Sequence, residues 1–203
     1  FSDQTSGKLS ARYAFTDTVA LRGTIASGFR APALAQQHYQ AVTTNINNGV
    51  AFETGTFPAS GAAAQALGGE PLKAETSLSY SLGLVLQPVD RLYLTIDAYQ
   101  IAIDDRIVLS SNLNIANNAA AQALLAALGI TNVTSARYFN NAIDTRTRGV
   151  DIVGTWNIPL ATSNLDLTTS YNYNKTEVTR IAPNPPELDA LGANLESMGR
   201  DER

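Results

Sequence analysis

Asp104 and Asp105 are adjacent carboxylates, and such a pair raises the question of acid–base catalysis. A pair of carboxylates can serve as acid and base in glycoside hydrolysis when both reach the same bond. These two close an alternating apolar segment, and neighbouring residues of a strand point to opposite faces. We therefore expect a strand-end pair and no catalysis. A β-rich hydrolase is the rival, in which replacing either aspartate would abolish activity.

The sequence lacks the residues that other catalytic and metal-binding sites require. The 203 residues include one histidine, His38, and no cysteine, so neither a histidine cluster nor a thiolate set can form. The Gly-x-Ser-x-Gly motif of a serine nucleophile is also missing. We expect no catalytic residue, no metal and no cofactor.

Residues suited to binding a polar ligand lie within the stretch GFRAPALAQQ, which starts at Gly28, and just after it. In one interpretation they form a ligand vestibule made of Arg30, Gln36, Gln37, Tyr39, Asn45 and Asn47. In the other, Ala31 and Pro32 end strand pairing, Arg30 lies at the rim beside a carboxylate, and the Asn-rich segment is merely solvated. Both interpretations stay open.

Six segments alternate between apolar and polar residues, as strands with one buried or lipid-facing side do. They are residues 8–15, 19–29, 75–87, 91–107, 136–158 and 164–181. The fourth changes parity, since Leu92 and Leu94 share one face while Tyr99 and Ile101 share the other. A β-bulge near 97–99 would bring both sets to one face.

The connections alternate between short and long. Residues 16–18, 88–90 and 159–163 are tight turns, whereas 31–74, 108–135 and the segment from 182 onward are long. An up-and-down sheet then has all tight turns on one side, as outer-membrane barrels do. We also expect a short helix at 117–128 in the second long loop, and a weaker one at 62–67.

The apolar faces of these strands are the expected contacts with a lipid bilayer. They carry Leu78, Leu82, Leu84 and Leu86, then Val150, Ile152, Trp156 and Ile158, and finally Leu165, Leu167 and Tyr171. The longest apolar run is too short for a membrane helix. The net charge is −4 and no basic cluster is present in the sequence, so we expect no nucleic-acid partner.

Four motifs in order, GFRAPALAQQ, LKAETSLSYSLGLVLQP, YLTIDAYQIAIDDRI and NNAIDTRTRGVDIVGTW, resemble strand motifs of TonB-dependent outer-membrane receptors. The resemblance implies an all-β, antiparallel up-and-down transmembrane β-barrel of about 22 strands, to which this chain supplies about six. It also implies a plug domain that contacts TonB, import of a siderophore, cobalamin or a glycan, and the outer membrane of a Gram-negative bacterium. Residues 1–203 would be a partial barrel without the plug or the last strand.

Two further expectations concern the chain by itself. A soluble all-β carbohydrate-binding module is the rival fold, and it would pack the leucine face of residues 75–87 against a second sheet. Spin labels at Leu82 and Leu167 would separate the two, because only a barrel exposes them to lipid. Six strands of an open barrel leave two free edges and a lipid-facing surface, so we expect the isolated piece either to self-associate or to adopt a rearranged fold.

Overall fold

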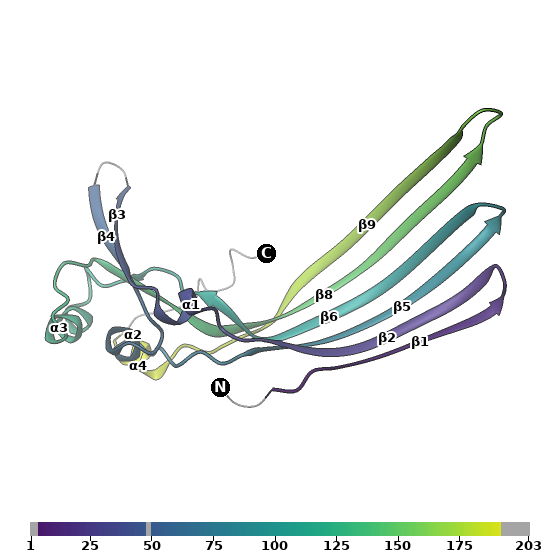
Figure 1. The fold of residues 1–203 in the computed structure, drawn as a ribbon. Coiled ribbons are helices and arrows are strands. Elements are labelled where there is room, and N and C mark those ends of the chain that lie inside the picture. Colours follow the sequence, from purple (N-terminus) through teal and green to yellow (C-terminus); the bar gives the residue numbers. More distant parts are fainter. Residues whose placement is uncertain (1–3, 48–49, 192–203) are drawn as a thin grey trace. The chain divides into compact units, whose positions relative to one another are not determined.

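The computed structural model describes residues 4–47 and 50–191, which are mainly strands (Figure 1). The strands are β1 Gly7–Thr16, β2 Val19–Arg30, β3 Ala41–Asn47, β4 Val50–Phe57, β5 Glu75–Val89, β6 Leu92–Leu109, β7 Leu113–Asn114, β8 Ser135–Pro159 and β9 Asn164–Ile181. The helices are α1 Leu34–His38, α2 Ala62–Ala66, α3 Ala119–Ala127 and α4 Pro186–Ala190. No helix in the described residues is both long enough and apolar enough to cross a membrane.

The chain forms two compact units. The first, here called the hairpin unit, contains the residues up to Phe29 together with Thr76–Ile103 and Thr145–Glu177. The second, the loop unit, contains Arg30–Glu75, Asp104–Asp144 and the residues from Val178 onward.

The hairpin unit is an up-and-down sheet of the six expected strands. Its order is β1-β2-β5-β6-β8, and β9 also pairs with β8. In the antiparallel pair of β1 and β2, Leu9 lies opposite Ile25 and Ser10 opposite Thr24. Consecutive strands run in opposite directions (Figure 1). The predicted strand order is therefore confirmed, and tight turns join β1 to β2, β5 to β6 and β8 to β9.

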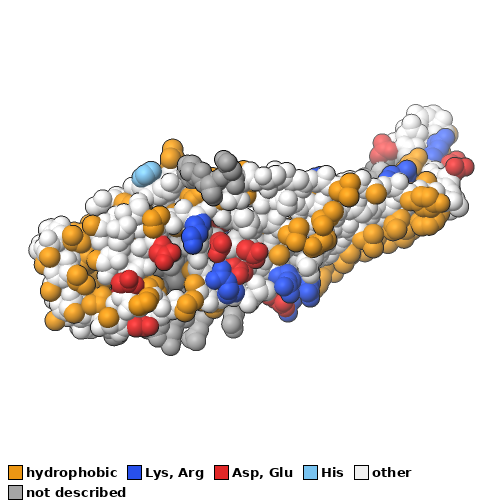
Figure 2. All heavy atoms as spheres, turned by 90° about the horizontal axis from the view of Figure 1, so that it is seen from below, with side chains coloured by type: hydrophobic (Ala, Val, Ile, Leu, Met, Phe, Trp, Pro, Cys, Tyr) orange, Lys and Arg blue, Asp and Glu red, His pale blue; other side chains and the backbone are white. Residues whose placement is uncertain are grey.

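The two faces of the hairpin unit differ in chemistry. One face is polar: Ser10 bonds Thr24, Asp151 accepts a hydrogen bond from Asn172, and Asn157 donates to Asp166. The other face carries large, exposed apolar side chains, which include Leu9, Ile25, Leu78, Leu82, Trp156, Leu165, Leu167 and Tyr171. Hydrophobic side chains form a band along these strands (Figure 2). Such a band matches the lipid-facing surface of a barrel strand.

The bulge that would bring both apolar sets of β6 to one face is not present at 97–99. Arg148 on β8 bonds Gln100, and a Cβ added at Gly154 would meet Leu94, so Leu94 and Gln100 lie on the same face. The ring of Tyr99 instead covers Gly149, on the opposite face. Alternation therefore continues through 97–99, and the apolar residues Ile101 and Ile103 belong to the polar face. In β6 the non-glycine residue with left-handed backbone is Asp105, with φ of 54°.

The loop unit has more strand structure than its sequence suggested. Strands β3 and β4 form a hairpin in the first long connection, with Thr43 opposite Thr54. Strand β4 pairs in parallel with β8, where the hydroxyls of Thr54 and Ser135 bond each other at 2.8 Å. The two-residue strand β7 pairs with β8 as well. The first and second long connections are thus ordered in part by pairing with β8.

Helices pack around a small core in the loop unit. The core includes Leu67, Ile115, Leu125, Tyr138 and Leu188, all fully buried. The hydroxyl of Tyr138 donates to the Leu67 carbonyl at 2.8 Å. Helix α3 confirms the helix expected in the second long loop; Asn118 caps it by accepting a bond from the Ala121 amide. Helix α2 confirms the weaker expectation, whereas α1 and α4 were not anticipated.

Candidate functional site

The end of β2 is fastened to the start of β5 by Arg30. Its Nε donates to Oε2 of Glu75 at 2.7 Å, and its Nη2 donates to Oε1 of the same carboxylate at 2.5 Å. The Ile107 amide adds a third hydrogen bond to Glu75, at 2.8 Å. A carboxylate partner for Arg30 was one of the two expectations, and the structure identifies that partner as Glu75.

The pKa of the buried Glu75 carboxyl reflects opposing effects. Burial by itself would raise the pKa, because it disfavours the charged form. The hydrogen bonds from Arg30 and from the Ile107 amide outweigh burial, and they hold the pKa below its ordinary value. Glu75 is therefore a charged structural residue at neutral pH.

The other predicted vestibule residues lie in α1 and the β3–β4 hairpin. Gln36 accepts a bond from the Ala33 amide at 3.0 Å, and Gln37 donates to the Pro32 carbonyl at 2.9 Å. The side chain of Tyr39 is about half exposed, at 49%. Asn45 and Asn47 pair through their backbones within the hairpin, but their side chains lie outside the described part of the structure.

A second charged cluster lies where β6, β8 and β9 enter the loop unit. Arg180 donates to Asp144 through Nε at 2.5 Å and through Nη2 at 2.9 Å, and it also reaches Asp105 at 3.0 Å. The Asp105 amide donates to Asp144 at 2.9 Å. The hydrogen bonds from Arg180 are the main reason that the pKa of Asp144 lies below its ordinary value, despite partial burial.

Asn141 connects this cluster to the connection before β5. Its amide group bonds both the N–H and the carbonyl of Lys73, at 2.8 and 3.1 Å, and donates to the Asp105 carbonyl at 2.6 Å. Asp105 is therefore held by its backbone and its side chain. Asp104, by contrast, is exposed. The two adjacent aspartates thus occupy different surroundings.

A polar hollow of about 520 Å³ lies beside this cluster. Its charged lining residues are Glu70, Lys73, Asp105, Arg180 and Glu187. Such a mixture of cations, carboxylates and amides can bind a polar ligand through hydrogen bonds without favouring a strongly charged one. Sequence reasoning missed this hollow, because its residues come from four distant segments and share no motif. No group of three or more metal-binding side chains occurs within the described ranges.

The sheet and its two contrasting faces define a barrel-strand protein of the outer-membrane type. The sequence matches the family model described as "TonB dependent receptor-like, beta-barrel" over residues 1–195. Because that match covers nearly all of the chain, the chain belongs to this family, and the resemblance read from the strand motifs is confirmed. Among curated proteins, no relative matches the sequence.

Solved structures with a similar fold include two siderophore receptors. PirA from Pseudomonas aeruginosa is 18% identical, with a TM-score of 0.59, over 86% of this chain and 28% of that one. PirA from Acinetobacter baumannii is 16% identical, with a TM-score of 0.52, over 86% and 23%. The RagAB peptide transporter is 17% identical, with a TM-score of 0.51, over 80% and 16%. The chain thus spans less than a third of each neighbour, and at these identities the likeness shows the fold.

Proposed function

We propose that the receptor containing this chain imports a scarce nutrient across the outer membrane and is energised through TonB. The observation that carries the proposal is the family match over residues 1–195, joined to a sheet with one exposed apolar face and one polar face. The loops would capture the nutrient, a plug domain outside this chain would contact TonB and rearrange, and the nutrient would pass along the polar face.

The exposed apolar face favours this proposal over a soluble carbohydrate-binding module. Such a module needs a second layer over Leu82 and Leu167, and both side chains are more than half exposed, at 56% and 53%. In a membrane this surface requires no cover, because lipid chains contact it directly.

The ligand class is proposed from the neighbours and from the loop unit. The two PirA proteins are described as siderophore receptors and RagAB as a peptide transporter. Cobalamin and glycans are the other candidate nutrients, as the resemblance to the family implies. Arg30, Gln36, Gln37, Tyr39, Asn45 and Asn47 are the proposed vestibule. Within it, Arg30 would position the loops through Glu75, and the half-exposed ring of Tyr39 would contact the ligand.

Uptake by the native bacterium tests this proposal. Deleting the receptor gene should abolish uptake of one labelled nutrient among a ferric siderophore, cobalamin, an oligosaccharide and a peptide, and deleting TonB should abolish the same uptake. Tyr39→Ala should weaken it, whereas Leu124→Ala, on the outer side of α3, should not. Undiminished uptake of all four nutrients, or uptake that continues without TonB, would contradict the proposal.

The proposed receptor is not an enzyme. One carboxylate oxygen of Asp105 accepts a hydrogen bond from Arg180, and its main-chain carbonyl accepts one from Asn141, which supports a structural role for this residue. Loss of a measured hydrolytic activity on changing Asp104→Ala or Asp105→Ala would favour the β-rich hydrolase.

A further inference from the structure

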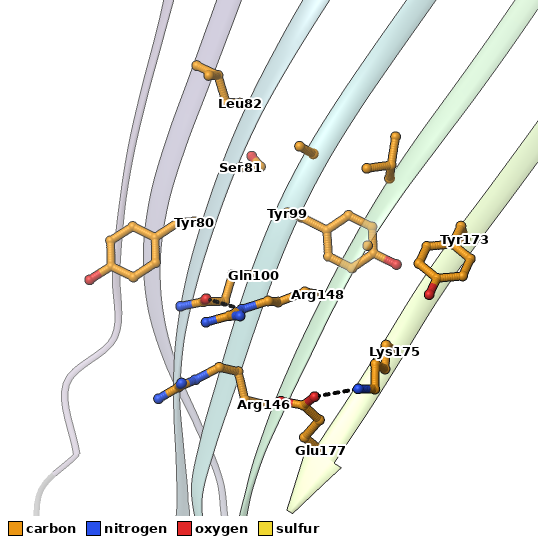
Figure 3. Close-up of a pocket in the computed structure, with 13 residues that line it drawn as sticks. Tyr80, Ser81, Leu82, Tyr99, Gln100, Arg146, Arg148, Tyr173, Lys175 and Glu177 are labelled. Carbon is orange, nitrogen blue, oxygen red and sulfur yellow. Dashed lines mark hydrogen bonds and ion pairs between the residues drawn. The ribbon is translucent and has the colours of Figure 1, made fainter. Parts of the chain in front are cut away.

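A basic hollow opens on the apolar face of the hairpin unit, and its lining includes none of the residues proposed to bind the nutrient. Its volume is about 690 Å³. Apolar and aromatic side chains on one side of it include Tyr80, Leu82, Val150 and Tyr173. Three cations, Arg146, Arg148 and Lys175, also line it, together with the carboxylate of Glu177 (Figure 3).

The contacts of neighbouring residues show which face these cations occupy. Thr147 bonds Thr176 at 2.8 Å, as Asp151 and Asn172 bond each other further along the same two strands. These pairs mark the polar face. Because side chains alternate along a strand, Arg148 and Lys175 belong to the opposite face, with the large apolar residues.

The position of the cations along the strands matches one boundary of a bilayer. Arg148 comes eleven residues before Pro159, the last residue of β8, and Lys175 comes eleven residues after Asn164, the first residue of β9. A tilted strand needs roughly 9–11 residues to cross the hydrocarbon. The cations therefore lie at the membrane surface on the side away from the tight turns, which is the outer side in this family of barrels.

The cluster holds more positive charge than its own residues neutralise. Lys175 pairs with Glu177 at 2.7 Å, and Arg148 donates from Nε to the neutral amide oxygen of Gln100 at 2.8 Å. Nε of Arg146 is buried and has no hydrogen-bond partner among the residues that the structure describes. Three cations and one carboxylate leave an excess of two positive charges beside lipid. Anionic groups at the membrane surface stabilise such charges.

From these observations we infer that Arg146, Arg148 and Lys175 bind the phosphate of a phosphorylated glycolipid in the outer leaflet. The guanidinium groups and the ammonium would donate hydrogen bonds to the phosphate oxygens. Leu82 and Val150 are apolar and lie nearer to the tight turns than the cations do, and they would contact an acyl chain of the same molecule. Glu177 would compete with the phosphate for Lys175. The inference rests on the outer-membrane location proposed above, but it requires no transported nutrient.

Binding of lipid A to the whole purified receptor in uncharged detergent micelles tests the inference, with native mass spectrometry as the readout. Wild-type receptor should retain diphosphorylated lipid A and release the enzymatically dephosphorylated lipid. Arg148→Gln with Lys175→Gln should weaken retention by about twenty-fivefold, at roughly fivefold for each cation. Glu177→Gln should strengthen it, because a competing anion is removed. Arg12→Gln is the matched control, because Arg12 lies opposite Arg22 on the polar face.

Three results would overturn the inference: equal retention of both lipids by the wild type, unchanged retention by the double variant, or an equal loss in the Arg12→Gln control. Each variant is first shown to keep the gel mobility of a folded barrel. Nutrient uptake is measured separately. A wild-type receptor that takes up the nutrient normally but does not distinguish the two lipids contradicts only the lipid site, whereas a wild-type receptor that binds lipid A selectively but takes up no labelled nutrient contradicts only the proposed import.

Discussion

At the scale of single residues, the Arg30–Glu75 pair shows what sequence can and cannot identify. Pro32 marks the place where pairing stops, so a charged residue at the rim with a carboxylate partner could be predicted. The partner itself could not be, because Glu75 lies 45 positions away and is brought near by the return of β5 to the sheet. The ion pairs of Arg180 could not be predicted either, because its partners Asp105 and Asp144 are also distant in the sequence.

Replacing Glu75 with glutamine should weaken the contacts that hold Arg30 and the Ile107 amide at the start of β5. Gln keeps the size of the side chain but removes the charge that binds Arg30 and strengthens the bond from the Ile107 amide, and hydrogen bonds to charged groups contribute about 1.5–3 kcal/mol. We expect amide hydrogen exchange of Ile107, corrected for its intrinsic rate, to become at least tenfold faster. Glu187→Gln, at an exposed carboxylate of the same unit, should leave it unchanged.

The same amide reports a pH dependence. The pKa of Glu75 is lower in the folded loop than its ordinary value of 4.5. Its contribution to stability is therefore complete above pH 4.5 and is lost as the pH falls through the folded pKa. Protection of Ile107 should decline below pH 4.5 in the wild type and stay constant with pH in Glu75→Gln. A wild-type decline that begins above pH 6 would contradict this assignment.

At the scale of elements, the strands of the hairpin unit were the most predictable part. Alternating residues and Pro or Asp at the turns placed their ends within about two residues. The β3–β4 hairpin is not evident from the sequence, although Asn48-Gly49 is a hairpin signal, because the Ala- and Asn-rich composition around it is typical of a solvated loop. The parallel pairing of β4 with β8 joins segments 81 positions apart, as in the bond between Thr54 and Ser135, and local sequence does not encode it.

Gly83 lets an ion pair cross strand β5. Arg22 on β2 binds Asp97 on β6 at 3.0 and 2.6 Å, and a Cβ at Gly83 would lie 2.0 Å from the Asp97 oxygen. Gly83→Ala should therefore displace Asp97 and destabilise the barrel by about 1–3 kcal/mol. The measurement is the temperature at which the receptor loses its folded gel mobility.

A neighbouring glycine and a double variant give the controls for Gly83. Gly23→Ala should change that temperature little, because the nearest atom to its Cβ would be 3.7 Å away. Adding Asp97→Ala to Gly83→Ala removes the clash, so the double variant should be more stable than the sum of the two single effects predicts. Strict additivity would show that the ion pair does not cross at Gly83.

At the scale of the whole molecule, the alternation of short and long connections was the feature of the sequence that best indicated the fold. It predicts an up-and-down sheet with all tight turns on one side, and the hairpin unit has that order. The polar hollow of the loop unit could not be predicted, since its lining residues converge only through tertiary folding. Fold and family could thus be read from local patterns, whereas binding surfaces depend on contacts between distant segments.

The proposed function depends above all on contact between lipid and the apolar face of the hairpin unit. Nitroxide labels placed singly at Leu167 and at its neighbour Thr168, which faces Thr155 on the polar side, test it in the whole receptor reconstituted into vesicles. The label at Leu167 should collide mainly with lipid-soluble oxygen, and the label at Thr168 should show a much lower ratio of oxygen to water-soluble nickel collisions. Equal ratios at the two positions, or a higher ratio at Thr168, would contradict the claim.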